Sequence, residues 1–226
     1  MYEYQNMAKY YDLFYQTKKY DEEIDFITKI IGDRKKVLDV GCGTGIHMHL
    51  LEEKGYSVNG IDLNKEMLNV AKTRVRGKLY NKNLLDFKIN QKYDVILSLF
   101  AVFNHLKSYE EFEKGLLNCY NHLKENGILI IDLHNGRKSG KKETIHENNQ
   151  RIMEWVFNED TYKETTKIKY IIDGKSYYDT HEFLIYKIKT LEKILKSNNF
   201  NYKFYEDFTF KEATELSKNI QLVVYK

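Results

Sequence analysis

The sequence predicts an α/β protein built on a doubly wound, mostly parallel β-sheet, and three observations lead to this fold class. A short apolar run, Val37–Val40, stops at three glycines spaced two residues apart. A helical pattern over His47–Lys54 follows at once. Further apolar runs alternate with helical patterns up to residue 133. Such alternation implies right-handed crossovers between parallel strands, with helices on both faces of the sheet.

The glycine-rich stretch Asp39–Gly45, with the sequence DVGCGTG, connects the first predicted strand to its helix. Glycine permits positive φ, and its missing side chain lets a ligand lie against the main chain, where the following helix presents free N–H groups. The stretch lacks the third glycine of the dinucleotide fingerprint, because Ile46 stands there, and it lacks the Gly-Lys-Ser/Thr of a phosphate loop. It therefore predicts a binding turn of another kind, against the alternative of an ordinary strand-to-helix turn.

The next strands extend this arrangement. The second predicted strand, residues 56–61, ends at Asp62, which lies 21 positions after Gly41. An acidic residue at this place suits two ribose hydroxyls. The alternative is a helix N-cap, a role that Asn64 could equally fill. Three more strands are expected over residues 78–81, 93–100 and 128–133, and the fourth strand leads into a loop at the carboxyl edge of the sheet, where open α/β sheets bind ligands.

The second half of the chain departs from the alternation of strands and helices. Residues 137–189 are predicted to form an insert that lies over the active edge. The insert consists of a polar surface loop over 137–150, followed by three antiparallel segments over 151–158, 162–172 and 176–189. Asp173-Gly174 is a strong hairpin signal. A helix over 190–197, a polar helix over 211–218, and strands over 201–208 and 220–225 complete seven sheet strands in one domain of residues 1–226.

The first twenty residues are rich in tyrosine. Met7, Tyr10, Tyr11 and Phe14 follow helical spacing, so Met1–Tyr20 is predicted to contain a helix. This helix either packs its apolar face on the domain or acts as an aromatic lid over a ligand, and its many hydroxyls favour the lid. An amphipathic helix is then expected over Tyr20–Ile31.

Composition excludes several classes of protein. The net charge of +3 is spread along the chain and gives no sign of nucleic-acid binding. No apolar run approaches the ~18 residues that a membrane span needs, and the N-terminus has no signal-peptide pattern. The two cysteines, Cys42 and Cys119, are expected to be free thiols in a reducing, cytoplasmic setting.

Together these features resemble the class I S-adenosylmethionine (SAM) dependent methyltransferases, a seven-stranded Rossmann-like family whose motif I reads D-x-G-x-G-x-G. Several stretches are similar to the nucleotide-linked amino-sugar N,N-dimethyltransferases. These stretches are Met1-Tyr2-Glu3, Tyr11–Tyr15, Asp39–His47, Asp86–Lys107 and Asp179–Tyr186. The Trp-rich segment that this family has after the fifth strand is replaced here by His134-Asn135-Gly136.

The resemblance implies SAM as the cofactor and assigns its contacts. Asp39, Gly41 and Gly43 would hold the amino-acid end, and Asp62 the ribose. Asn83 and Leu84 fall at the adenine position, where Asn83 replaces an acid; an amide oxygen can still accept from the adenine amino group, and Asp86 is the alternative contact. Leu99, near the end of the fourth strand, and Tyr15, which matches a lid tyrosine, complete the cofactor-binding set.

Methyl transfer from a sulfonium is an in-line displacement, so positioning supplies most of the rate. An amine acceptor must also lose a proton, which calls for a base. The candidates are His105, ranked first, then His181, with His134 also at the active edge and Tyr15 as a hydrogen-bonding partner. No metal site is predicted, because these histidines lie on separate loops without a matching carboxylate spacing.

The predicted function is SAM-dependent methylation of a small molecule, with the amine of an amino sugar or a similar metabolite as the favoured acceptor. Three alternatives stay open: an O-methyltransferase acting on a hydroxylated metabolite or glycan, a nucleic-acid methyltransferase, and a SAM-binding protein without catalysis. The nucleic-acid enzyme is disfavoured because Asn104-His105 lacks the Pro-Pro-aromatic run of amino-directed enzymes. The number of methyl groups transferred and a homodimeric state are left open.

Overall fold

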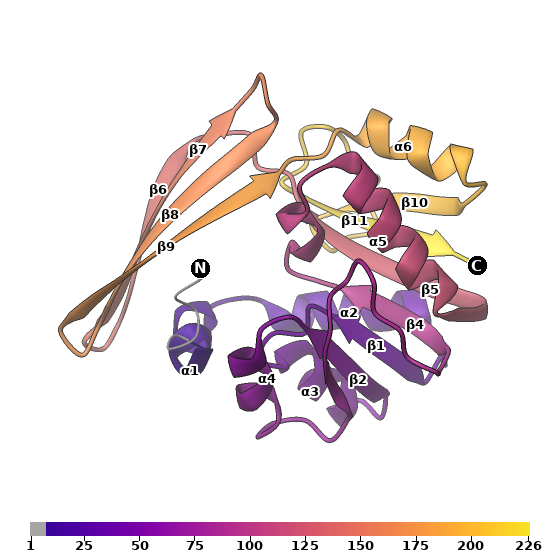
Figure 1. The fold of residues 1–226 in the computed structure, drawn as a ribbon, viewed down its shortest axis with the longest axis horizontal. Coiled ribbons are helices and arrows are strands. Elements are labelled where there is room, and N and C mark those ends of the chain that lie inside the picture. The colour runs from indigo at the N-terminus through magenta and orange to yellow at the C-terminus, as the bar shows by residue number, and fades with distance from the viewer. Residues whose placement is uncertain (1–7) are drawn as a thin grey trace.

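The computed structural model describes residues 8–226, which form a central seven-stranded sheet and a separate four-stranded sheet (Figure 1). The strand order of the central sheet is β10-β11-β5-β4-β1-β2-β3. Strands β1 to β5 pair in parallel. Strand β11 is antiparallel to β5, and β10 is antiparallel to β11. The strands are β1 (Lys36–Val40), β2 (Ser57–Asp62), β3 (Leu79–Asn81), β4 (Tyr93–Ser98), β5 (Leu123–His134), β10 (Asn201–Glu206) and β11 (Asn219–Tyr225). The predicted doubly wound fold is confirmed.

Helices cover both faces of this sheet, because its central strands are buried on both sides. On one face, α5 (Tyr109–Asn121) and α6 (Ile188–Ser197) pack apolar side chains on alternate residues of β1, β4, β5 and β11. On the other face, α2 (Tyr20–Ile31) and α3 (Ile46–Glu53) pack on the remaining residues of those strands, joined by Leu68 of α4 (Lys65–Ala71). The core therefore lies in two layers, and the strand ends that carry the loops remain at the sheet edge.

The insert is a meander of four antiparallel strands that stands beside the central sheet (Figure 1). Its strands are β6 (Gly140–His146), β7 (Asn149–Asn158), β8 (Lys163–Ile172) and β9 (Lys175–Leu184). The hairpin predicted at Asp173-Gly174 is present, and both residues have positive φ, 49° and 75°. The surface loop predicted over 137–150 is wrong, because β6 forms there. Apart from the exposed Ile145 its side chains are polar, so the strand carries no apolar alternation and depends on pairing with β7.

Two further expectations fail for local reasons. The polar helix predicted over 211–218 does not form, because hydroxyls there bond nearby groups instead: Ser217 Oγ accepts from the Thr214 N–H and donates to the Glu206 carboxylate. The fifth strand begins earlier than predicted, at Leu123. Asn126 at φ 60° lies where the pairing register with β4 shifts, so the expected turn at Asn126-Gly127 is absorbed as an irregularity within one strand.

The described N-terminal segment consists of two short helices, α1 (Ala8–Tyr11) and η2, a 3-10 helix (Asp12–Tyr15), rather than one continuous lid helix. The stretch Met1–Met7, including Met1-Tyr2-Glu3, lies outside the described residues. Phe14 is buried and its ring lies 5.7 Å from that of Tyr170 on β8. The segment therefore packs on the insert, so the core interpretation of its aromatic residues holds for Phe14.

Candidate active site

The loop Gly41–Gly45, called the Gly loop below, uses its glycines in different ways. Gly41, Gly43 and Gly45 all have positive φ, at 81°, 53° and 80°. A Cβ on Gly41 would lie 2.4 Å from Val102 Cγ2, so this glycine lets the short helix η3 (Val102–His105) approach the loop. A Cβ on Gly43 would meet no atom within 4 Å. The main chain at Gly43 is therefore the part of the loop that a ligand can approach.

Asp62, at the end of β2, connects the Gly loop to the next helix. Its Oδ2 accepts from the Gly43 N–H at 2.8 Å, and its Oδ1 accepts from the Asn64 N–H at 2.7 Å. The N-cap of α4 is Asn64, whose side chain accepts from the N–H groups of Glu66 and Met67. The cap role is thus filled by Asn64, and each Asp62 oxygen keeps a lone pair for a further donor such as a hydroxyl.

Asp39, at the end of β1, is a buried carboxyl beside Asp62. Burial first, and the charge of Asp62 second, raise its pKa to about 7. Burial also raises the pKa of Asp62, although the N–H groups of Asn64 and Gly43 oppose the shift. Two desolvated carboxyls at the strand ends give this place a negative potential above neutral pH, which favours a cationic ligand.

We expect Asp39→Asn to change how stability depends on pH. The folded pKa of about 7 exceeds that of an unfolded aspartate, so the folded chain binds the extra proton between about pH 4 and 7. The stability contributed by this group is therefore fully present below pH 4 and falls by about 1.4 kcal/mol per pH unit as the pH rises toward 7. Urea unfolding from pH 4.5 to 8 should show a flatter profile for the variant, and parallel profiles would contradict the assignment.

The loop that follows β4 is held in a strained conformation. Phe100 and Ala101 both have positive φ, 63° and 60°, which side-chain-bearing residues rarely adopt. The Phe100 N–H donates to Asp132 Oδ2 at 3.0 Å, and the other oxygen of this buried carboxylate accepts from Gln221 Nε2 at 2.8 Å. Strained residues that are fixed by buried contacts cluster at functional sites. The role of Asp132 in holding this loop was not predicted. The only sequence feature that pointed to Asp132 was its position at the end of the fifth strand, in Asp132-Leu133-His134-Asn135.

Asn104 joins three segments at one buried point. Its Nδ2 donates to the carbonyl oxygens of His134 at 2.9 Å and Leu184 at 2.7 Å, and its Oδ1 accepts from the His134 N–H at 2.9 Å. The side chain is fully buried, so these bonds are not exposed to competition from solvent. Asn104 therefore fixes η3 to the end of β5 and to the last residue of β9. Sequence reasoning did not identify this positioning role.

The N-terminal segment is bonded to the Gly loop through Asp12. Its Oδ1 accepts from Thr44 Oγ1 at 2.6 Å and its Oδ2 from Arg74 Nη2 at 2.7 Å, while Arg74 Nη1 donates to the Thr44 carbonyl at 2.7 Å. The Tyr15 ring consequently lies edge-on to Phe100 at 5.0 Å between ring centroids. Tyr15 thus stands at the loop after β4, where a lid residue is expected.

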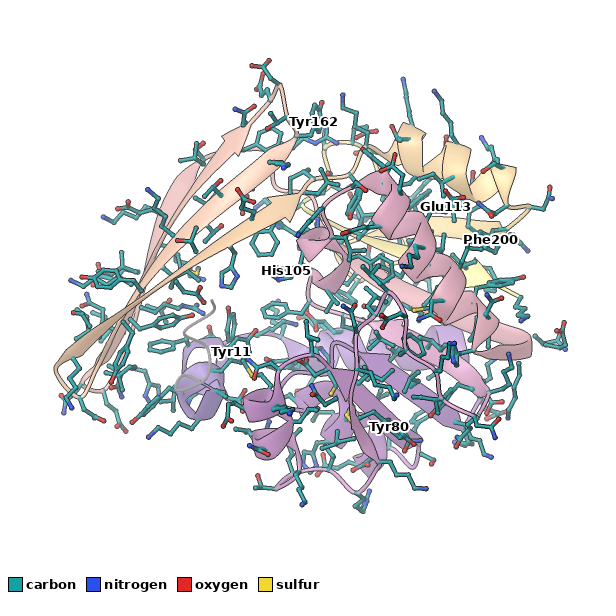
Figure 2. The ribbon with its side chains drawn as sticks, viewed as in Figure 1. Tyr11, Tyr80, His105, Glu113, Tyr162 and Phe200 are labelled. Atoms are coloured by element: carbon teal, nitrogen blue, oxygen red, sulfur yellow. The ribbon has the colours of Figure 1, made fainter. Side chains whose placement is uncertain are left out.

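The three candidate histidines come together between η3, the end of β5 and β9. The His105 ring lies 4.6 Å from the ring of Phe183 and 5.6 Å from that of His181, and Figure 2 shows His105 on the side of η3 that faces β9. His181 Nε2 lies 3.3 Å from Asp179 Oδ2, and His134 Nε2 lies 3.1 Å from Glu164 Oε2. Two imidazole–carboxylate pairs therefore flank His105.

The surroundings of His105 shift its pKa. His105 is exposed to solvent, yet the groups of η3 and the insert around its ring reduce the hydration of the charged form and lower its pKa to about 4. The neighbouring His181 lowers this pKa further, and Asp179 opposes the shift. The His105 ring is consequently neutral at pH 7.

The residues predicted at the adenine lie after β3 and β4. Asn83 Oδ1 accepts from the Leu85 N–H at 2.9 Å and has a second lone pair left. The side chains of Leu84 and Leu99 are buried in the core, so a contact with adenine would come from their main chains. Asp86 is exposed. These cofactor contacts remain predictions.

Within residues 8–226 no group of three or more His, Cys, Asp or Glu side chains is placed to hold a metal ion. In the same residues no helix has the length and apolar character to cross a bilayer. Cys42 and Cys119 are buried free thiols.

Known proteins share the domain and the fold of this chain. Residues 37–127 match the model of a methyltransferase domain family. A SAM-dependent methyltransferase from Clostridium acetobutylicum superposes with a TM-score of 0.84 at 23% identity, covering 98% of both chains. SAM-bound CalS10, an amino pentose methyltransferase from Micromonospora echinaspora, superposes with a TM-score of 0.75 at 16% identity over 93% of each chain. The chain carries a methyltransferase domain and has the fold of the class I SAM-dependent methyltransferases.

Within its class, the methyltransferase is similar to an enzyme named for its acceptor. It is 31% identical over 133 residues to the dTDP-3-amino-3,4,6-trideoxy-alpha-D-glucopyranose N,N-dimethyltransferase of Streptomyces venezuelae. That alignment covers 55% of this chain and 56% of the relative, so the methyltransferase spans about half the length of this relative.

The residues of this methyltransferase fit its cofactor, SAM. The open main chain at Gly43 admits a ligand, and Asp62 has lone pairs for the two ribose hydroxyls. The buried carboxyl of Asp39 suits the positive charge that SAM carries. Tyr15 lies against Phe100 in the segment that Asp12 bonds to the Gly loop, and its role as a lid residue stays a prediction.

Proposed function

We propose that this methyltransferase moves a methyl group from SAM to the amine of a small molecule, most simply an amino sugar. The observation that carries the proposal is the pair of buried carboxylates, Asp179 and Glu164, which meet the imidazoles of His181 and His134 beside His105. Carboxylates in a poorly hydrated place attract a protonated amine. The imidazoles give the departing proton an acceptor.

The geometry favours His181 over His105 as the base, which reverses the order expected from the sequence. A neutral imidazole with a pKa of about 4 accepts a hydrogen bond, but it takes a proton from an ammonium group with little driving force. His181 is oriented by a carboxylate, the arrangement that stabilises the imidazolium form once a proton arrives. His105 is then suited to hold the amine in line.

When bound, SAM supplies a methyl group on a sulfonium that leaves without needing an acid. The chain's own residues therefore act mainly by placing the two reactants, which is worth up to roughly 7–11 kcal/mol in favourable cases. The Gly loop and Asp62 would fix one reactant, and η3 with the inner side of β9 would fix the other. Asn104 holds β9 at a fixed position relative to the central sheet, because its side chain bonds both β5 and β9.

The amino-sugar acceptor is supported by the similarity to the Streptomyces venezuelae N,N-dimethyltransferase. The test is a panel of amines and nucleotide-linked amino sugars, assayed for S-adenosylhomocysteine formation, with the product analysed by NMR. A methyl group on nitrogen supports the proposal. A product methylated only on oxygen would replace it with an O-methyltransferase, and a chain that does not bind SAM in calorimetry would end it.

We expect His181→Ala to lower kcat about ten- to a hundredfold, because the base contributes less than positioning does. His105→Ala should lower kcat less and raise KM for the acceptor. SAM affinity should stay unchanged in both, and His49→Ala on the exposed side of α3 is the control. Tyr15→Phe should keep most of the activity. Complete loss of turnover in His105→Ala with intact SAM affinity would instead make His105 the essential base.

A further inference from the structure

Arg151, on β7 of the insert, is a buried cation with unused donors. It is 2% exposed, and only its Nη2 has a bond, to the Phe14 carbonyl at 3.2 Å. Its Nε and Nη1 are buried and have no hydrogen-bond partner among the described residues. A guanidinium has five N–H donors and keeps its charge in a protein, so it cannot relieve the cost of burial by losing a proton.

The other described arginines near the sheet are satisfied in ordinary ways. Arg74, Arg76 and Arg137 pair with Asp12, Glu52 and Glu215. Lys18, whose ammonium lies over the Phe100 ring at 4.9 Å, pairs with Glu23. Arg151 makes no ion pair within residues 8–226. Stacking on Phe14 and Tyr15, with its guanidinium carbon 5.3 and 4.4 Å from the ring centroids, offsets only part of the cost.

A second unused polar group lies beside Arg151. Thr144 on β6 is its direct cross-strand partner, so both side chains stand on the same face of the insert. Thr144 Oγ1 is buried and also has no hydrogen-bond partner among the described residues. Two neighbouring buried groups that lack partners indicate a missing ligand that accepts hydrogen bonds.

This pair of residues is connected to the candidate active site. Arg151 stacks on Tyr15, and Tyr15 stacks edge-on against Phe100 at the end of β4. The Tyr11 ring lies 4.7 Å from that of Tyr15, and Figure 2 shows Tyr11 on the N-terminal segment, beside the lower part of the insert. A ligand held by Arg151 would therefore lie beside the lid residue and within the same site.

We propose that Arg151, with Thr144, binds an oxyanion, a carboxylate or phosphate group, of a molecule that enters this site. Guanidinium donors match the two oxygens of such a group, and the threonine hydroxyl adds a third donor. The oxyanion comes either from the carboxylate of the cofactor or from an anionic group on the acceptor. The second source rests on the proposed function, since it gives the amine-bearing acceptor a phosphate or carboxylate.

The test compares wild type with Arg151→Met by calorimetry, using three probes. S-adenosylhomocysteine carries the carboxylate, 5′-methylthioadenosine lacks it, and inorganic pyrophosphate is added to protein saturated with S-adenosylhomocysteine. If the cofactor supplies the oxyanion, the variant loses about ten- to a hundredfold in affinity for S-adenosylhomocysteine and none for methylthioadenosine. If the acceptor supplies it, pyrophosphate binds wild type and not the variant.

Two further variants keep the test decisive if Arg151→Met folds poorly. Thr144→Val, which preserves shape, should lower the same affinity about fivefold. Arg151→Lys keeps the charge but loses the planar guanidinium, so its affinity for the oxyanion-bearing probe should lie between those of wild type and Arg151→Met. Lys167→Met, on the outer face of β8, removes a charge without touching this face and should behave as wild type.

Equal affinities of wild type and Arg151→Met for all three probes overturn the proposal. Such a result, in a wild-type protein that binds S-adenosylhomocysteine and methylates an amine, would leave the proposed function standing. Conversely, loss of oxyanion binding in the variant supports the site even where no amine in the panel is methylated.

Discussion

Asp62→Ala is expected to lower the affinity for SAM about a thousandfold. The carboxylate has lone pairs for two ribose hydroxyls, and each hydrogen bond to a charged group contributes about 1.5–3 kcal/mol. The substitution also removes the acceptor of the Gly43 N–H, so the part of the Gly loop that a ligand approaches loses its support. Calorimetric titration with S-adenosylhomocysteine, together with urea unfolding, separates the loss of binding from the loss of stability.

Asn64→Ala is the matched control for Asp62. It removes the N-cap of α4 but leaves the Asp62 carboxylate and the Gly43 contact in place. Its expected cost is about 1 kcal/mol of stability with little change in SAM affinity. If Asp62→Ala and Asn64→Ala lose stability alike and both bind S-adenosylhomocysteine as wild type does, Asp62 only shapes the helix entry and the ribose assignment fails.

Gly41→Ala is expected to destabilise the fold by about 3 kcal/mol and to lower SAM affinity at least a hundredfold. Two costs add: about 1–2 kcal/mol for a side chain at positive φ, and about 1–3 kcal/mol because the new Cβ would overlap Val102. The clash pushes η3 and the Gly loop apart, and both carry site residues. Thermal and urea unfolding measure the first effect, and calorimetry measures the second.

Gly55→Ala separates the two costs. Gly55 has φ 84°, close to the 81° of Gly41, but a Cβ there would meet no atom within 4 Å. It should lose about 1–2 kcal/mol of stability and no SAM affinity. The double variant Gly41→Ala/Val102→Ala removes the overlapping methyl groups and should regain part of the binding. A single Gly41→Ala variant that resembles Gly55→Ala in both measurements would show that the close approach to η3 is unimportant.

Sequence reasoning succeeded where a pattern is local. The helix expected over Tyr20–Ile31 has those bounds in the structure, because its apolar positions repeat at helical spacing and Gly32 ends it. The parallel strands were also predictable from a local pattern, because strands buried on both faces are apolar nearly throughout. Asp62 and the Gly loop could be placed together because the carboxyl ends of parallel strands meet at one edge.

Sequence reasoning failed where pairing or a distant partner decides the structure. Strand β6 has a single apolar side chain, Ile145, and no apolar alternation, so only its pairing with β7 defines it. Asn104 bonds a residue 80 positions away on β9, and Arg151 bonds one 137 positions away in the N-terminal segment. Asp12 reaches Arg74 across 62 positions. Hydrophobic periodicity cannot predict contacts between residues so far apart in the sequence, so the roles of these residues were identified only in the structure.

The attachment through Asn104 has a consequence for how this enzyme can diversify. One amide joins η3 to the last residue of β9, and the rows of the insert far from Leu184 join the N-terminal segment through Arg151 and Phe14. Substitutions on the opposite face of the insert, such as at Lys167 on β8, alter neither attachment. That face can therefore vary among descendants of one ancestral gene while the residues around both reactants are inherited unchanged.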